Sequence, residues 1–362
     1  MKKILFNIAA ILLGCFMALV LLEVTFRFLP VMDAFRTQPV NAANRYVHYL
    51  ENRDLIYSHG WNFSQRNRVH SNNYGYINDQ DYTGAADNAL ISVIGDSFVE
   101  ALMVPYRDTV QGRISASLGD KGRAYSFGIS GAPLSQYLVF AELAKEEFNT
   151  DAMVFVVVIN DFDQSLYKYK KAPMFSYFVE DKSGRSLTLR SFDFKPGHMR
   201  KLMRNSALVR YLFSNLQAHE TLRRIVYKKR RFDYLADAVT DEDMRRVSDS
   251  RAAVDRFFEL LPSLSGLPEG RILFVVDGLR EGIYDDTRDF EKSYFNIMRD
   301  YFLSSARERS YETIDMQDVF LRDYRANGKR FEFDDDGHWN AYAHKLVFEE
   351  IQDSAVFSGL FK

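Results

Sequence analysis

Residues 90–97 read Leu-Ile-Ser-Val-Ile-Gly-Asp-Ser, a short apolar run that ends in a glycine and two polar residues. An apolar run of this length, closed by a glycine, predicts a buried strand followed by a sharp turn. Residues 152–159, 271–277 and 311–315 have the same character, and residues 124–127 are a weaker candidate. The chain therefore contains a series of short buried strands.

Amphipathic helical patterns separate these strands, near residues 108–119, 134–147, 250–261, 287–308 and 340–353. Near-continuous apolar strands that alternate with helices indicate a parallel sheet covered by helices on both faces. We therefore expect an α/β fold, a three-layer α/β/α sandwich of the flavodoxin-like kind.

The composition sets broad limits on function. The chain has 362 residues, of which 47% are apolar and 27% charged, and this is ordinary for a globular protein with a sizeable core. The formal net charge of −2 gives no general attraction to nucleic acid. The one cysteine, Cys15, excludes an intrachain disulfide.

The N-terminus predicts a membrane segment. Lys2 and Lys3 precede an apolar run over residues 4–22, which as a helix would span roughly 28 Å, close to the hydrocarbon thickness of a bilayer. A cleaved signal peptide, a lipoprotein signal at Cys15 and a buried core helix are the alternatives. We interpret residues 1–30 as a single-pass anchor in a bacterial inner membrane. The positive-inside rule then places the rest of the chain in the periplasm.

The rest of the chain divides into two parts, and the second contains an insertion. Residues 31–89 lack strong periodicity and form a lead-in, and residues 90–362 form the α/β domain. Residues 162–248 interrupt the alternation of strands and helices, so we expect an inserted cap there. The cap begins with the cluster YKYKKAPMFSYF and continues into a basic helical stretch over residues 200–231. That stretch is either a contact for anionic lipid or acidic polysaccharide or a solvated helical face.

Four groups of polar or glycine residues lie at the ends of predicted elements. Their position is informative because ligands of parallel α/β sheets bind at the carboxyl ends of the strands. Ser97 follows the first strand and could be a nucleophile or a helix cap. Gly128-Ile129-Ser130-Gly131 follows the second, where glycine allows close backbone approach. Asn160 follows the third and could donate to an oxyanion or cap the turn.

The fourth feature is Asp334-Asp335-Asp336-Gly337-His338-Trp339-Asn340, just before the last helix. A histidine beside a carboxylate is what a serine nucleophile requires, because the imidazole accepts the hydroxyl proton and the carboxylate fixes its tautomer. A run of aspartates could also bind a metal, but this spacing matches no familiar metal signature. We expect no metal and no cofactor.

Together these features resemble the SGNH/GDSL hydrolase superfamily over about residues 90–350. The resemblance implies that Ser97 is the nucleophile and His338 the base. It also implies an oxyanion hole built from the Ser97 backbone N–H, Gly131 and Asn160. The orienting acid is Asp336 or Asp335. The usual family spacing favours Asp335, whereas the Asp-Gly-His-Trp block resembles SGNH-like acetyltransferases of exopolysaccharides such as alginate and favours Asp336.

Two positions depart from the family pattern. The first block reads Gly-Asp-Ser-Phe rather than Gly-Asp-Ser-Leu, and Val158 stands where a glycine usually precedes the asparagine. The resemblance implies a serine esterase that acts on O-acyl esters, in particular acetyl esters of envelope polysaccharide. An O-acetyltransferase for exported polysaccharide is an alternative. A non-catalytic carbohydrate-binding or assembly module is the other alternative, which Val158 and the insertion keep open.

Overall fold

The computed structural model describes residues 2–85, 87–181, 186–197, 203–218, 234–235, 241–285 and 290–361. The chain forms two compact units. The N-terminal unit comprises Met1–Arg36, Asp54–Val69 and Pro196–Arg230. The sheet unit comprises Thr37–Arg53, His70–Lys195 and Arg231–Lys362. Residues 31–89 therefore contribute to both units.

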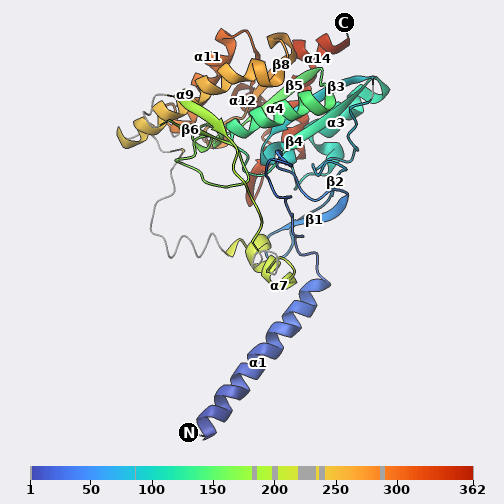
Figure 1. The fold of residues 1–362 in the computed structure, drawn as a ribbon, viewed down its shortest axis with the longest axis vertical. Helices are drawn as coiled ribbons and strands as arrows, with labels where there is room; N and C mark the ends of the chain where they lie inside the picture. The colour runs from blue at the N-terminus through green and yellow to red at the C-terminus, as the bar shows by residue number, and fades with distance from the viewer. Residues whose placement is uncertain are drawn as a thin grey trace. The chain divides into compact units, whose positions relative to one another are not determined.

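The sheet unit is built on a five-stranded sheet in which every neighbouring pair is parallel (Figure 1). Its strands are β3 (Ala89–Gly95), β4 (Gly122–Gly128), β5 (Ala152–Val157), β8 (Ile272–Val276) and β9 (Glu312–Asp315), in the spatial order β4-β3-β5-β8-β9. Counted along the chain, this is the order 2-1-3-4-5 of flavodoxin-like folds. The predicted parallel α/β sheet is confirmed.

Alternate side chains of each strand enter two separate layers of the core. On one face, Ile91, Val154 and Val275 belong to a buried cluster that also includes side chains of α3 (Val110–Leu118), α12 (Met316–Asn327) and α13 (Ala341–Gln352). On the other face, the ring of Phe155 contacts that of Phe257, and the ring of Phe274 contacts that of Phe302.

Phe257 and Phe302 lie on α9 (Asp241–Ser265) and α11 (Tyr294–Glu308), and α4 (Leu134–Phe148) packs beside α9 (Figure 1). β3, β5 and β8 are therefore buried on both faces, which is why their sequences are almost continuously apolar, whereas the edge strand β9 is only partly buried.

Several predicted boundaries shift by a few residues. The strand predicted to reach residue 159 ends at Val157, because the chain turns there. The helix predicted at 250–261 is longer, since α9 begins in a polar stretch whose periodicity is weak. The helix predicted from residue 287 begins at Tyr294, where the Ser293 hydroxyl accepts a hydrogen bond from Asn296 N at 3.3 Å. Residues 286–289 lie outside the described residues.

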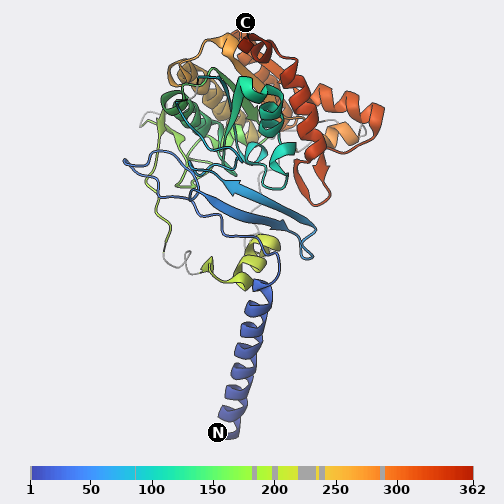
Figure 2. The same cartoon turned by 90° about the vertical axis from the view of Figure 1, so that its right-hand side faces the viewer.

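Shorter elements complete the described chain. In the lead-in, β1 (Arg53–His59) pairs with β2 (Gln65–Ser71), and the two strands lie side by side in Figure 2. In the insertion, β6 (Tyr177–Glu180) pairs antiparallel with β7 (Leu187–Arg190). The remaining helices and strands are α2 (Ser97–Glu100), α5 (Asp161–Gln164), α7 (Ala207–Arg210), α10 (Arg280–Tyr284), β10 (Glu332–Phe333), β11 (Asp336–Trp339) and α14 (Ala355–Ser358).

Single turns connect several of these elements. They are the 3₁₀ turns η1 (Tyr106–Asp108), η2 (Gly119–Lys121), η4 (Glu269–Arg271) and η5 (Gly359–Phe361), and a π-helical turn, η3 (Tyr211–Asn215). Of the basic stretch predicted at 200–231, residues 203–218 are described, and they form α7 and η3. The rest of that prediction lies outside the described residues.

The N-terminal unit begins with α1 (Lys2–Arg27), whose mean hydropathy is 2.7 and none of whose residues is buried. Among the described residues it is the one helix long and apolar enough to cross a membrane, and a signal sequence has the same properties. The Glu23 carboxylate accepts hydrogen bonds from Ser206 Oγ (2.7 Å), Ala207 N (3.1 Å) and Leu208 N (2.9 Å). The C-terminal part of α1 is thereby tied to the start of α7.

Candidate active site

The chain reverses its direction of travel across the sheet at β3, which pairs with β4 on one side and β5 on the other. The strands are in register, with Gly95 opposite Gly128 and Ile94 opposite Phe155. In open parallel sheets, ligands bind at such a switch point, outside the carboxyl ends of the strands. The first three sequence features follow β3, β4 and β5, so they meet at this edge.

The turn after β3 presents Ser97 at the start of α2. The N-cap of α2 is Asp96, whose carboxylate accepts a hydrogen bond from Phe98 N at 3.0 Å. The turn packs closely on β4, because a Cβ on Gly128 would lie 2.8 Å from Glu100 N and 2.9 Å from Asp96 O. Besides Asp96 Oδ2 at 3.3 Å, the Ser97 hydroxyl has a second and closer partner.

That partner is His338. The distance between Ser97 Oγ and His338 Nε2 is 2.7 Å, and His338 Nδ1 is hydrogen-bonded to Asp336 Oδ1. The same carboxylate oxygen accepts from His338 N at 3.1 Å. A carboxylate only accepts, so Nδ1 carries the proton and Nε2 accepts from the Ser97 hydroxyl. The imidazole donates to Asp336 and not to Asp335, which is an exposed neighbour.

The surroundings favour a protonated His338 more than bulk water does. Burial of the imidazole lowers its pKa, but the hydrogen bond from Nδ1 to Asp336 and the negative charges of Asp336, Asp96 and Glu100 outweigh that effect. The pKa of His338 is therefore raised above its ordinary value of 6.5. An imidazole in this state is a stronger proton acceptor.

Asp277 holds the loop that carries His338. This carboxylate follows β8, accepts from Trp339 Nε1 at 2.9 Å, and forms a two-pronged ion pair with Arg280 at 2.6 and 2.7 Å. Arg280 also donates to the Gly337 carbonyl at 3.3 Å. The residues on both sides of His338 are thus fixed to one buried carboxylate.

In the sequence, Asp277 is the last residue of the strand predicted over residues 271–277, and no catalytic role was predicted for it. A charged side chain at the carboxyl end of an apolar strand was the available signal. By contrast, His344 packs within the last long helix, α13. It is buried, its Nδ1 accepts from Val110 N at 3.3 Å, and burial lowers its pKa to about 3.

Three hydrogen-bond donors stand near the strand ends without strong partners. The backbone N–H groups of Ser97 and Gly131 donate to no other residue that the structure describes, and Gly131 has a φ of +78°. The Asn160 side chain makes no cap hydrogen bond to α5, and its amide donates only weakly, to Gln164 Oε1 at 3.5 Å. These are the groups that the resemblance assigns to an oxyanion hole.

The departure at Val158 has a structural reason. Its side chain is fully buried in the apolar cluster beneath α3 and α13, and its N–H donates to Asp161 Oδ2 at 2.8 Å. The valine therefore contributes to the core without displacing Asn160 from the turn.

Glu100 is a further buried carboxylate that the sequence analysis missed. It accepts from Tyr49 Oη at 2.5 Å and from Ser130 N at 3.1 Å, and it also contacts the Ser130 hydroxyl. Burial raises its pKa to about 7, although these hydrogen bonds act in the opposite direction. Glu100 therefore ties α2 to the loop that carries Gly131.

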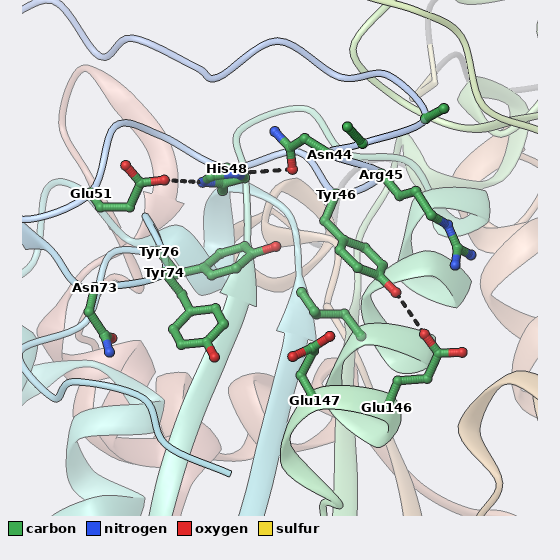
Figure 3. A pocket seen from close by; sticks show the side chains of 13 residues that line it. Asn44, Arg45, Tyr46, His48, Glu51, Asn73, Tyr74, Tyr76, Glu146 and Glu147 are labelled. Atoms are coloured by element: carbon green, nitrogen blue, oxygen red, sulfur yellow. Dashed lines mark hydrogen bonds and ion pairs between the residues drawn. The ribbon is translucent and has the colours of Figure 1, made fainter.

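The sheet unit also has a pocket with a volume of about 400 Å³ (Figure 3). Tyr46 and Tyr74 lie on either side of it, and Tyr46 Oη donates to Glu146 at 3.0 Å. It is lined by Ala42, Ala43, Asn44, Arg45, Tyr46, His48, Glu51, Asn73, Tyr74, Tyr76, Leu143, Glu146 and Glu147. Ser97 and His338 are not among these residues.

Neither a protein-family model nor a curated relative matches the chain. Solved structures with a similar fold include a member of the lipolytic protein G-D-S-L family from Veillonella parvula, with 10% identity, 73% of this chain and 97% of that chain covered, and a TM-score of 0.38. An acetyl xylan esterase has 13% identity, 72% and 97% coverage, and a TM-score of 0.38.

An α/β hydrolase from the metagenome of Lake Arreo in Spain has 10% identity, 76% and 97% coverage, and a TM-score of 0.42. These similarities concern the fold.

The carboxylate partner of His338 can be tested by NMR titration of its imidazole. We expect Asp336→Asn to lower the pKa of His338, because the hydrogen bond and the charge that favour the imidazolium are lost. The variant imidazole would then lose its proton at a lower pH than in the wild type. Asp335→Asn is the matched control and should change the pKa little. A larger shift in the control than in Asp336→Asn would contradict this assignment.

Proposed function

We propose that the chain is a serine-dependent esterase that cleaves O-acyl esters. The observation that carries the proposal is the chain of contacts from Ser97 Oγ through the His338 imidazole to the Asp336 carboxylate. This is the arrangement of nucleophile, base and orienting acid that activates a serine. In it, Ser97 is the nucleophile, His338 the general base and Asp336 the orienting acid.

The reaction would proceed in two steps. Ser97 Oγ forms a bond to the ester carbonyl carbon, its proton passes to His338 Nε2, and the carbonyl electron pair moves onto the oxygen. The carbonyl then re-forms, the bond to the alcohol breaks, and the alcohol takes the proton from His338. Attack of water or of another hydroxyl on the acyl-Ser97 ester repeats these transfers and releases the serine.

The oxyanion of each step would be held by the backbone N–H groups of Ser97 and Gly131 and by the Asn160 amide. Their lack of competing strong hydrogen bonds supports this role, since such donors act best when they already point at the developing charge. Each such donor typically lowers the barrier by about 3–4 kcal/mol. The positive φ of Gly131 suits the sharp turn that presents its N–H.

A fluorophosphonate probe tests whether Ser97 is activated. We expect Ser97→Ala to abolish labelling and to reduce hydrolysis of p-nitrophenyl acetate by roughly 10⁴-fold or more. Ser117→Ala, which changes an exposed serine of α3, should retain both. If the folded wild-type protein is not labelled at Ser97, the domain is a non-catalytic binding or assembly module instead.

We further propose that the ester is an acetyl group on a glycan. The pocket between Tyr46 and Tyr74, which Ser97 does not line, supports a glycan as the molecule that carries the ester, because sugar rings stack on aromatic faces and their hydroxyls bond to carboxylates and amides such as Glu147 and Asn73.

The acceptor can be identified by incubating the protein with an acetyl ester donor, with and without an oligosaccharide. We expect acetate to form at the same rate in both mixtures, as for a hydrolase. Mass spectrometry of the oligosaccharide would show whether it has gained acetyl groups. Acetylated oligosaccharide accumulating at the expense of acetate would identify an O-acetyltransferase.

We propose that α1 is retained as a membrane anchor, with the sheet unit in the periplasm. The helix runs unbroken through Arg27, and Glu23 is bound by the start of α7, so the residues after the apolar run belong to folded structure.

The intact mass of the protein extracted from membranes should include residues 1–22. Cys15→Ser should stay in the membrane fraction. A mature N-terminus beyond residue 22, or release of Cys15→Ser, would refute the anchor.

A further inference from the structure

The lysine-rich start of the insertion directs one of its lysines toward the candidate active site. Lys168 forms ion pairs with Glu180 at 2.6 Å and Asp249 at 2.7 Å. Lys171 is exposed, with its ammonium 5.5 Å from the centre of the Tyr167 ring. Lys170 is largely enclosed instead and reaches the loops that follow β4 and β5.

The Lys170 ammonium joins the two loops that carry the proposed oxyanion donors. Its Nζ donates to the Gly131 carbonyl at 2.5 Å and to Gln164 Oε1 at 2.6 Å. Gln164 Oε1 is also the acceptor for the Asn160 amide at 3.5 Å. A Cβ on Gly131 would lie 3.2 Å from Nζ, so this cation lies directly against that glycine.

We infer that Lys170 is a positioning residue of the oxyanion hole, which fixes Gly131 and Asn160 and places a positive charge beside the developing oxyanion. The inference rests on the proposed esterase function. It extends that function by giving a residue of the insertion, outside the four sequence blocks, a part in the reaction.

The charges around Lys170 explain why the site needs it. Asp96 and Asp161 are buried carboxylates that act electrostatically on Lys170, and Asp163, which is paired with Arg246, also faces it. Burial raises the pKa of both Asp96 and Asp161, and the ionised fraction of these carboxyls would repel an oxyanion that forms close to them. A fixed ammonium offsets that repulsion before the reaction begins, so no reorganisation is needed at the transition state.

The same surroundings give the lysine a pH signature. Burial lowers the pKa of Lys170 below its ordinary 10.5, although the charges of Asp96, Asp161 and Asp163 oppose the change. The charged form is therefore lost at a lower pH than for a free lysine. The kcat of the wild type should consequently fall on the alkaline side, as the pH rises through this lowered pKa.

The test compares kcat, KM and their pH profiles for p-nitrophenyl acetate in the full-length protein. We expect Lys170→Met to lower kcat by about 10–100-fold with little change in KM, because a contribution made in the transition state is lost. Lys170→Arg keeps the charge and should recover most of kcat, with its alkaline limb moved to higher pH. Lys171→Met is the matched control and should behave as the wild type.

Thermal unfolding of each variant shows whether it is folded at the assay temperature. An unchanged kcat in folded Lys170→Met would overturn the inference and leave the esterase proposal standing. The inference would also be overturned if kcat fell in the variants but the alkaline limb of the pH profile was the same in the wild type, Lys170→Met and Lys170→Arg. A lysine with a purely structural role would leave the pH profile unchanged. A wild type without Ser97-dependent turnover would overturn the inference and the proposed function together.

Discussion

The parallel hydrogen-bonded register of β3 between β4 and β5 is the constraint on which the candidate site depends. It aligns Gly95 with Gly128 and brings the ends of the three strands to one edge. Neighbouring strands lie about 4.8 Å apart, so residues that follow them can converge on one small group. A slip of one residue in β3 would turn its core side chains to the other face, so burial on both sides protects this register.

Buried carboxylates then fix the loops that leave the sheet. Asp277 holds the segment around His338 through Trp339 and Arg280, and Glu100 holds the loop of Gly131 through Ser130. A buried polar group without its partners is costly, so each network is stable only when the loops take these positions. The carboxylates therefore convert the alignment of the strands into a defined placement of side chains.

Charge is distributed unevenly around Ser97. Negative groups near His338 raise the pKa of its imidazole, which suits a proton acceptor, while Lys170 stands on the side of Gly131 and Asn160. A reaction that takes a proton from Ser97 and leaves negative charge on the carbonyl oxygen needs both polarities, one on each side of the reacting carbon. The arrangement thus fits acyl transfer better than simple ligand binding.

The sequence by itself determined the layers of the fold and the positions of most candidate residues. Short apolar runs separated by helical periods are sufficient for a parallel sheet, because strands buried on both faces cannot alternate in polarity. The ends of those runs located Ser97, Gly131 and Asn160. Periodicity was weaker at the boundaries, so α9 and α11 began elsewhere than predicted.

Only the tertiary structure decided which distant side chains meet. The contact of His338 with Asp336 rather than Asp335 depends on the direction of the β11 backbone, and the local sequence allows both. Glu100 and Lys170 gave no signal of their own, and the place of Asp277 at the end of an apolar strand was a weak one, because a charged residue in a linear sequence is most often solvated. Their roles arise from burial and from partners far along the chain, which a sequence read one segment at a time does not contain.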